Sequence, residues 1–124
     1  MSLDQQRLSD YLAHILEAIE RIESYTEDMD EMGFLEDRKA QDAVIRNFEI
    51  IGEASNNIAK HCPQFAESHP ELPLAFAYRM RNAVAHGYFK VDLGIVWKSI
   101  SSDLPPLYAR VREIVQGLST GRDS

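Results

Sequence analysis

Hydrophobic and polar positions alternate with the period of an α-helix along much of the chain. In the first segment an apolar residue recurs every three or four positions, which predicts an amphipathic helix over residues 4–26. The same spacing predicts a second helix over residues 36–61, which Pro63 ends. The two predicted buried stripes consist of Leu8, Leu12, Ile15, Leu16, Ile19 and Ile22, and of Val44, Ile45, Phe48, Ile51, Ala54 and Ile58.

The segments beside these helices have a different composition. Residues 23–37, "ESYTEDMDEMGFLED", are strongly acidic and are expected to form a connecting loop. Residues 62–73, "CPQFAESHPELP", contain three prolines and no sustained period, so a second loop is expected there. Gly52 lies inside the second helix, where glycine costs about 1 kcal/mol relative to alanine. We therefore expect the small residues Gly52, Ala54 and Ser55 to let another helix approach closely.

The C-terminal half continues the helical pattern. A third helix is predicted over residues 74–86, and Asp92 is the expected N-cap of a fourth segment. Pro105-Pro106 is expected to open the last helix, and the tail at residues 119–124 is expected to fray. No segment has the period of a convincing strand. The chain is therefore predicted to be a single all-α domain over residues 1–124, an antiparallel bundle of about four to five helices.

Composition and charge narrow the class of protein. The 124 residues suit one domain, and 44% hydrophobic with 27% charged residues is typical of soluble globular proteins. The apolar runs are far shorter than the ~20 residues that span a bilayer, and a single cysteine allows no internal disulfide. We expect a cytoplasmic protein. The net charge of −7 argues against coating nucleic acid by bulk charge, although a local basic site remains compatible with it.

Several sites that bind metals or phosphate are not supported by the sequence. Residues 28–33, "DMDEMG", begin like a calcium loop, but Met32 and Lys39 occupy positions that require oxygen ligands. Cys62 has no partner cysteine, and there is no Gly-rich phosphate loop. The four histidines, which show no metal-ligand spacing, are His14, His61, His69 and His86. We expect no metal and no cofactor.

The richest candidate chemistry lies in residues 79–92, "RMRNAVAHGYFKVD". On a helix, Asn82 and His86 are four residues apart and share a face, so the Asn82 amide can orient the imidazole. Arg81 is five residues from His86, about 140° away on an ideal helix. These two side chains meet only if the turn at Gly87 bends the chain, or if two copies contribute them across a two-fold axis.

These residue types suffice to cleave RNA without a metal. His86 can move the proton of a ribose 2′-hydroxyl while Arg81 stabilises the charge that develops on the neighbouring phosphate. Arg79 and Lys90 are candidate RNA-binding residues beside them. The alternative from residue types alone is structural: Arg81 pairs with a glutamate on another helix, His86 caps a helix end, and Tyr88 anchors the following loop.

The stretch "RNAVAHGY", Arg81-Asn82-x3-His86-x-Tyr88, resembles the signature of the HepT-like HEPN-domain toxins. Residues 48–58, "FEIIGEASNNI", and residues after the motif, "VDLGIVWKSISSDLPPLYARV", also resemble that family. The resemblance implies a helical-bundle homodimer that acts as a metal-independent endoribonuclease, the toxin of a toxin–antitoxin pair. It implies that Arg81 and His86 are catalytic at the dimer interface, with Asn82 in support.

The resemblance also implies two partners besides the second copy: an RNA substrate and a minimal nucleotidyltransferase antitoxin that uses ATP to attach AMP to Tyr88. The added phosphate would place negative charge and bulk near Arg81, where an RNA phosphate should bind. The alternative is a non-catalytic HEPN-type module that binds a nucleotide or another protein. RNA binding that weakens with salt would favour the ribonuclease over this module.

Overall fold

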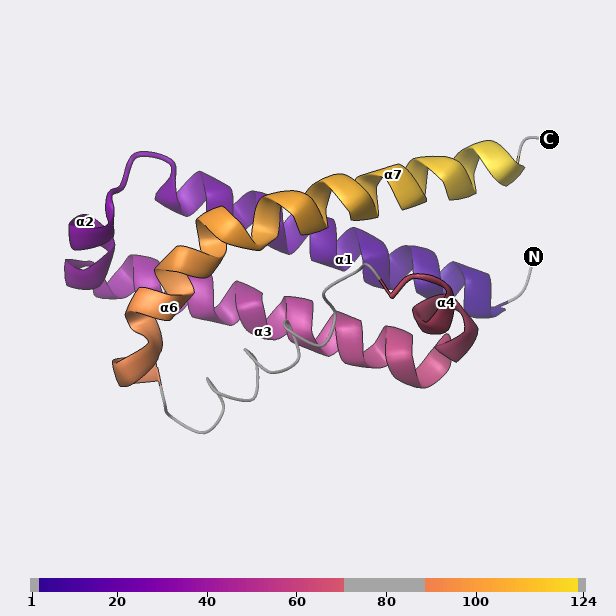
Figure 1. The fold of residues 1–124 in the computed structure, drawn as a ribbon, viewed down its shortest axis with the longest axis horizontal. Coiled ribbons are helices and arrows are strands. Elements are labelled where there is room, and N and C mark those ends of the chain that lie inside the picture. The colour runs from indigo at the N-terminus through magenta and orange to yellow at the C-terminus, as the bar shows by residue number, and fades with distance from the viewer. Residues whose placement is uncertain (1–2, 71–88, 123–124) are drawn as a thin grey trace.

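The computed structural model describes residues 3–70 and 89–122, with side chains over residues 6–70 and 93–118. Every regular element in these ranges is an α-helix, which confirms the predicted all-α class (Figure 1). The six helices of the two ranges are α1 (Leu3–Thr26), α2 (Glu31–Glu36), α3 (Arg38–His61), α4 (Pro63–Ser68), α6 (Phe89–Ser102) and α7 (Leu104–Arg122). The predicted helix over residues 74–86 lies outside the described residues.

The long helices α1 and α3 form the centre of the bundle. They run antiparallel beside each other, and α7 lies along α1 with its end close to the start of α1 (Figure 1). Both predicted stripes are largely buried, because each faces the other helix. The fully buried members are Leu12, Ile15, Ile19 and Ile22 of α1, and Val44, Phe48, Ile51 and Ile58 of α3. Leu16 and Ile45 depart from the prediction, since both are only half-buried.

The buried face of α3 is wider than its apolar stripe. Gly52, Ala54 and Ser55 are all buried, as expected of small residues at a close helix contact. Two steps of about 100° separate Gly52 from Ala54, which places them about 160° apart by the shorter way round the helix. Small residues therefore occupy both edges of the buried face instead of one patch. Asn47 is buried as well. Its Nδ2 donates to the carbonyl oxygen of Ala43 at 2.8 Å, while its Oδ1 has no hydrogen-bond partner in the described part of the chain.

The acidic segment is not a continuous loop, because residues 31–36 form the short helix α2. The Asp30 side chain accepts a hydrogen bond from the Gly33 N–H at 2.8 Å and caps its start. Asp37 separates α2 from α3 and serves both: its N–H donates to the Phe34 carbonyl, and its side chain accepts from the Ala40 N–H at 3.0 Å. The expectation of a loop over residues 23–37 was therefore wrong at residues 31–36, and α3 begins at Arg38.

The second expected loop also contains a helix. Pro63 ends α3 as predicted, and it occupies the first turn of α4 at the same time. Proline suits this position because the first helical N–H needs no intrahelical partner. His69 closes α4, with its Nδ1 3.0 Å from the Phe65 carbonyl oxygen and its ring stacked on the Phe65 ring. Together with α2, this helix raises the count above the four to five helices expected.

The last two helices meet at a sharp corner (Figure 1). α6 begins at Phe89, so Asp92 lies within its first turn and the prediction that it is the N-cap was wrong. α7 opens with Pro105-Pro106 in its first turn, as predicted. It continues to Arg122, beyond the expected end near residue 118.

Candidate functional site

The motif that carries the candidate chemistry lies outside the described residues, with one partial exception. Arg79, Arg81, Asn82, His86 and Tyr88 all fall in the range 71–88. The backbone of Lys90 belongs to the first turn of α6. The shared face of Asn82 and His86 and the composite site of two copies therefore remain predictions.

The C-terminal flank of the motif is attached to the core through α6. Phe89, the residue after Tyr88, is the first residue of this helix. Further along α6, Val96 and Ser99 are buried, and the Trp97 ring packs on the Phe34 ring of α2 with centroids 5.3 Å apart. α6 also contacts α7. Contacts on both sides thus hold the helix that follows the candidate catalytic stretch.

The α3 segment that resembles the family, residues 48–58, has one face in the core and one in solvent. Phe48, Ile51 and Ile58 are fully buried, whereas Glu53 and Asn56 are exposed. The buried residues hold α3 against α1. Within the described contacts, this segment provides packing between α3 and α1.

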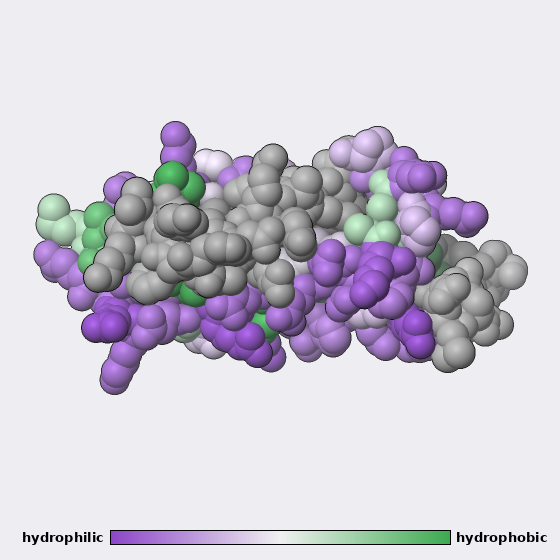
Figure 2. Space-filling model, turned by 90° about the horizontal axis from the view of Figure 1, so that it is seen from below, coloured by the Kyte–Doolittle hydropathy of each residue, from purple (hydrophilic) through white to green (hydrophobic). Residues whose placement is uncertain are grey.

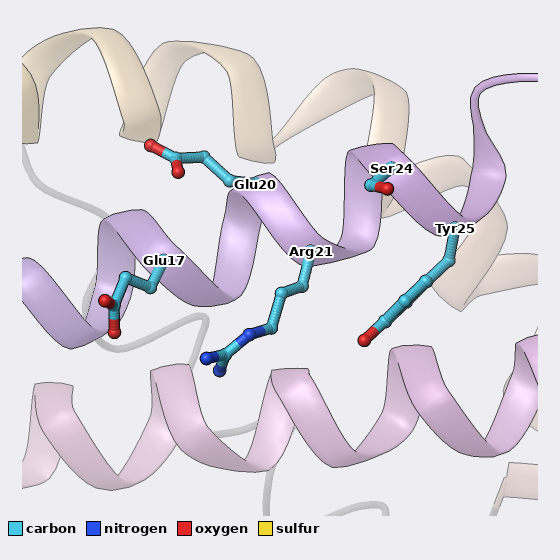
Figure 3. Close-up of a pocket in the computed structure, with 5 residues that line it drawn as sticks. All are labelled: Glu17, Glu20, Arg21, Ser24 and Tyr25. Carbon is cyan, nitrogen blue, oxygen red and sulfur yellow. The ribbon is translucent and has the colours of Figure 1, made fainter.

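A shallow hollow on α1, about 430 Å³ in volume, is lined by residues that sequence reasoning did not single out (Figure 3). Arg21 points toward α3, while Glu20 points toward α7 (Figure 3). The hydroxyl of Tyr108 on α7 donates to Glu20 Oε2 at 2.8 Å, and this bond raises the pKa of Tyr108 above its ordinary value. The hollow combines two carboxylates with one arginine, and its described residues include no nucleophile–base pair. The lining residues are Glu17, Glu20, Arg21, Ser24 and Tyr25.

A second hollow, about 580 Å³ in volume, lies where the start of α2 meets the exposed face of α6. Its wall combines the apolar Ile95 and Trp97 with the polar Glu31, Lys98 and Ser101, and Gly94 leaves part of it open. Across residues 3–70 and 89–122, no group of three or more His, Cys, Asp or Glu side chains could hold a metal ion. None of the helices in these ranges is long and apolar enough to cross a membrane.

Comparison with known proteins identifies the family. The sequence profile of the family "Ribonuclease HepT-like" matches residues 15–114. The chain belongs to the HepT-like ribonuclease family. It is 45% identical over 105 residues to "Probable ribonuclease HepT" of Thermococcus cleftensis, which covers 85% of this chain and 93% of that protein. No solved structure matches the chain significantly.

A second relative places the HepT-like sequence within a longer protein. The chain is 40% identical over 114 residues to "Gamma-glutamylcyclotransferase and putative RNase MJ0434" of Methanocaldococcus jannaschii. The match covers 92% of this chain but only 50% of that protein. The family profile extends from α1 to α7 and includes the whole of residues 79–92. The resemblance first seen in the motif and its flanking segments is therefore confirmed over most of the fold.

Proposed function

We propose that this HepT-like chain is a metal-independent endoribonuclease whose active pair is Arg81 and His86. The observation that supports this most directly is the family match over residues 15–114, a range that includes the Arg81-Asn82-x3-His86-x-Tyr88 stretch of this sequence. The names of the relatives, ribonuclease HepT and RNase, agree with RNA as the substrate.

The reaction we propose is attack of a ribose 2′-hydroxyl on the adjacent phosphate. His86 accepts the hydroxyl proton, and the forming O–P bond displaces the 5′-oxygen of the next nucleotide, which takes up a proton. Arg81 stabilises the negative charge on the phosphorane, because its guanidinium presents two parallel N–H donors to phosphate oxygens. Asn82 orients the imidazole, and Arg79 and Lys90 hold neighbouring phosphates.

We propose that the site is completed by a second copy of the chain. Arg81 and His86 are about 140° apart on an ideal helix, so one copy cannot easily direct both at a single phosphate. A two-fold axis beside this helix would bring Arg81 of one copy near His86 of the other. Mixing two inactive variants tests this directly, because a heterodimer of Arg81→Ala and His86→Ala chains would regain one intact composite site.

We further propose that a nucleotidyltransferase antitoxin inhibits the enzyme by attaching AMP to Tyr88. The tyrosine is two residues from His86 and immediately precedes α6. A phosphodiester there would compete with RNA for Arg81 through its negative charge and block access through its size. Incubating the protein with this enzyme and ATP should therefore abolish RNA cleavage by wild type and leave cleavage by Tyr88→Phe unchanged.

The deciding experiment is cleavage of labelled total RNA by purified protein in excess EDTA, after intact mass has shown that Tyr88 is unmodified. We expect wild type to cleave and both His86→Ala and Arg81→Ala to lose cleavage while retaining the circular dichroism of the fold. His14→Ala is a matched control, because His14 is an exposed histidine on α1. Cleavage that requires added metal, or that survives His86→Ala, would contradict the proposal.

The net charge of −7 favours a second candidate, a non-catalytic nucleotide-binding or protein-interaction module. A ribonuclease must attract a polyanion, whereas a module that binds a protein or a single nucleotide need not. Titrating single-stranded RNA at several salt concentrations separates the two. Binding that weakens steeply with salt supports the ribonuclease, and absent or salt-independent RNA binding supports the module.

A further inference from the structure

A tyrosine and a histidine from the two central helices form an open pair of rings near the end of the bundle at which α1 begins. The ring of Tyr11 on α1 and the ring of His61 in the last turn of α3 are nearly parallel, with 25° between their planes and 6.4 Å between their centroids. Tyr11 is half-buried and His61 is exposed, so both rings can be reached from solvent. We call these two side chains the Tyr11–His61 pair.

A second pair of the same kind shows what distinguishes the first. Phe65 and His69 enclose nearly the same angle, 26°, but their centroids are only 4.2 Å apart, so each ring covers a face of the other. The His69 Nδ1 atom lies 3.0 Å from the Phe65 carbonyl oxygen, which holds the imidazole in this closed arrangement. At 6.4 Å, the rings of the Tyr11–His61 pair are either separated by a gap or displaced sideways, and both arrangements leave ring face uncovered. The open pair can therefore stack on a third planar group.

The core beneath the two rings fixes their position. Leu12, the neighbour of Tyr11, and Ile58, three residues before His61, are both fully buried, and α1 packs along α3 there. Cys62, the residue after His61, is buried as well. Both backbones that carry the rings are thus held by packing within the chain. A planar ligand would find the ring faces already in place, which lowers the entropic cost of binding.

Two cations flank the Tyr11–His61 pair. Arg7 lies one helical turn before Tyr11 on the same face of α1, and Lys60 precedes His61 in α3. Both are exposed, and neither forms an ion pair with a described residue. Asp10 and Lys60 each lie about 100° round their helix from the neighbouring ring. The long, flexible stem of the lysine can bring its charge to the rings, whereas the short side chain of Asp10 cannot.

Acidic side chains gather at the opposite end of the bundle. Exposed carboxylates surround α2 and the turn before it, far from the end at which α1 begins and α3 ends (Figure 1). They are Glu27, Asp28, Asp30, Glu31 and Glu36. A polyanion would be repelled there. Figure 2, a view from below, shows mostly hydrophilic residues among the described ones over the half in which α3 ends. The net charge of −7 therefore does not describe the surroundings of the Tyr11–His61 pair.

We propose that the Tyr11–His61 pair is a subsite for single-stranded RNA, at which one base stacks on the rings while Arg7 and Lys60 hold the adjacent phosphates. This inference rests on the proposed function, which supplies RNA as the substrate. Tyrosine and histidine rings are among those that stack on unpaired bases in RNA-binding proteins. Such stacking accepts any base, because every base has a π face. The subsite thus adds affinity for the RNA chain without adding sequence preference.

The test is binding of a fluorescein-labelled, single-stranded RNA of mixed sequence, measured by fluorescence anisotropy. Every chain in this assay also carries His86→Ala, so that cleavage does not consume the probe, and this single variant is the parent. His61→Ala removes one stacking face, and we expect it to weaken binding about tenfold. His61→Phe keeps an aromatic ring and should bind within about threefold of the parent. Because His61 is exposed, neither change should lower the Tm measured by circular dichroism.

The salt dependence of the same assay tests the two cations. Arg7→Gln and Lys60→Gln should each lower the slope of log K against log salt concentration by about one, because each removes one phosphate contact. Lys39→Gln is the matched control, since Lys39 is an exposed lysine at the opposite end of α3, and it should leave the slope unchanged. His69→Ala, which disrupts the closed ring pair, should bind within about twofold of the parent.

Three outcomes would overturn the subsite: no RNA binding by the parent, equal binding by the parent and His61→Ala, or an equal loss in His69→Ala. Displacement of the RNA by micromolar AMP would assign the rings to a free nucleotide and would overturn it as well. In chains that retain His86, His61→Ala should raise KM and leave kcat unchanged, because it removes binding that substrate and transition state share. Failure of the proposed function would appear separately, as absent RNA cleavage by wild type.

Discussion

The contact between Phe34 and Trp97 joins α2 to α6, and its loss should have a measurable cost. Phe34 is fully buried, and replacing a buried phenylalanine by alanine costs about 3–5 kcal/mol in free energy of unfolding. The aromatic pair supplies about 0.5–1.5 kcal/mol of that. Because α2 has only six residues, it can shift and fill part of the cavity. We therefore expect Phe34→Ala to lower the free energy of unfolding by about 3 kcal/mol.

Urea denaturation followed by tryptophan fluorescence measures this effect at the contact itself, because Trp97 is the single tryptophan of the chain. Phe34→Ala should also shift the native emission to the red, since it opens the partly buried Trp97 ring to water. Phe34→Leu retains most of the apolar volume and should cost less than about 1.5 kcal/mol. Met32→Ala alters an exposed residue of the same helix and should change stability by less than about 0.5 kcal/mol.

The result that would refute this reasoning is a Phe34→Ala protein with unchanged emission and a loss of stability below about 1 kcal/mol. Such a result would mean that α2 is not held to α6 through this ring pair.

Three further predictions concern polar groups. Asp37→Ala removes the N-cap of α3 and should lower the free energy of unfolding by about 1 kcal/mol in urea titrations. Asn47→Leu should leave that free energy unchanged or raise it by up to about 1 kcal/mol, because the buried amide oxygen lacks a partner in the described part of the chain. Asn47→Asp should lower it. The hydrogen bond to Glu20 raises the pKa of Tyr108, so its contribution to stability is present below about pH 10 and is lost as the pH rises through the raised pKa. Glu20→Gln should move the ionisation of Tyr108 to lower pH. This is measured as the part of the tyrosinate absorbance that Tyr108→Phe removes, since the chain has five tyrosines.

The long helices could be predicted from the sequence because each buries a stripe that repeats over many turns. The ends of α1 and α3 fall within about two residues of the predicted bounds for that reason. The short helices α2 and α4 could not be found this way, since six residues contain less than two turns of any period. What forms them is local: the Asp30 cap and one buried ring in α2, and Pro63 in α4.

The candidate site could be predicted only in its residue types. Arginine, histidine and tyrosine within eight positions, residues 81–88, specify phosphate binding, proton transfer and a modifiable hydroxyl. In the site that we propose, their arrangement around a substrate depends on how two copies meet, and the sequence of one chain contains no direct record of that contact.

Three junctions between helices consist of one residue each: Asp37 between α2 and α3, Cys62 between α3 and α4, and Asp103 between α6 and α7. Adding one residue at such a junction would turn the next helix by about 100° about its axis and direct its apolar stripe away from the core. These corners should therefore reject insertions that ordinary surface loops accept. Within the described ranges, the turn at residues 27–30 is longer than these one-residue junctions, and a tag or a fused domain is best placed there.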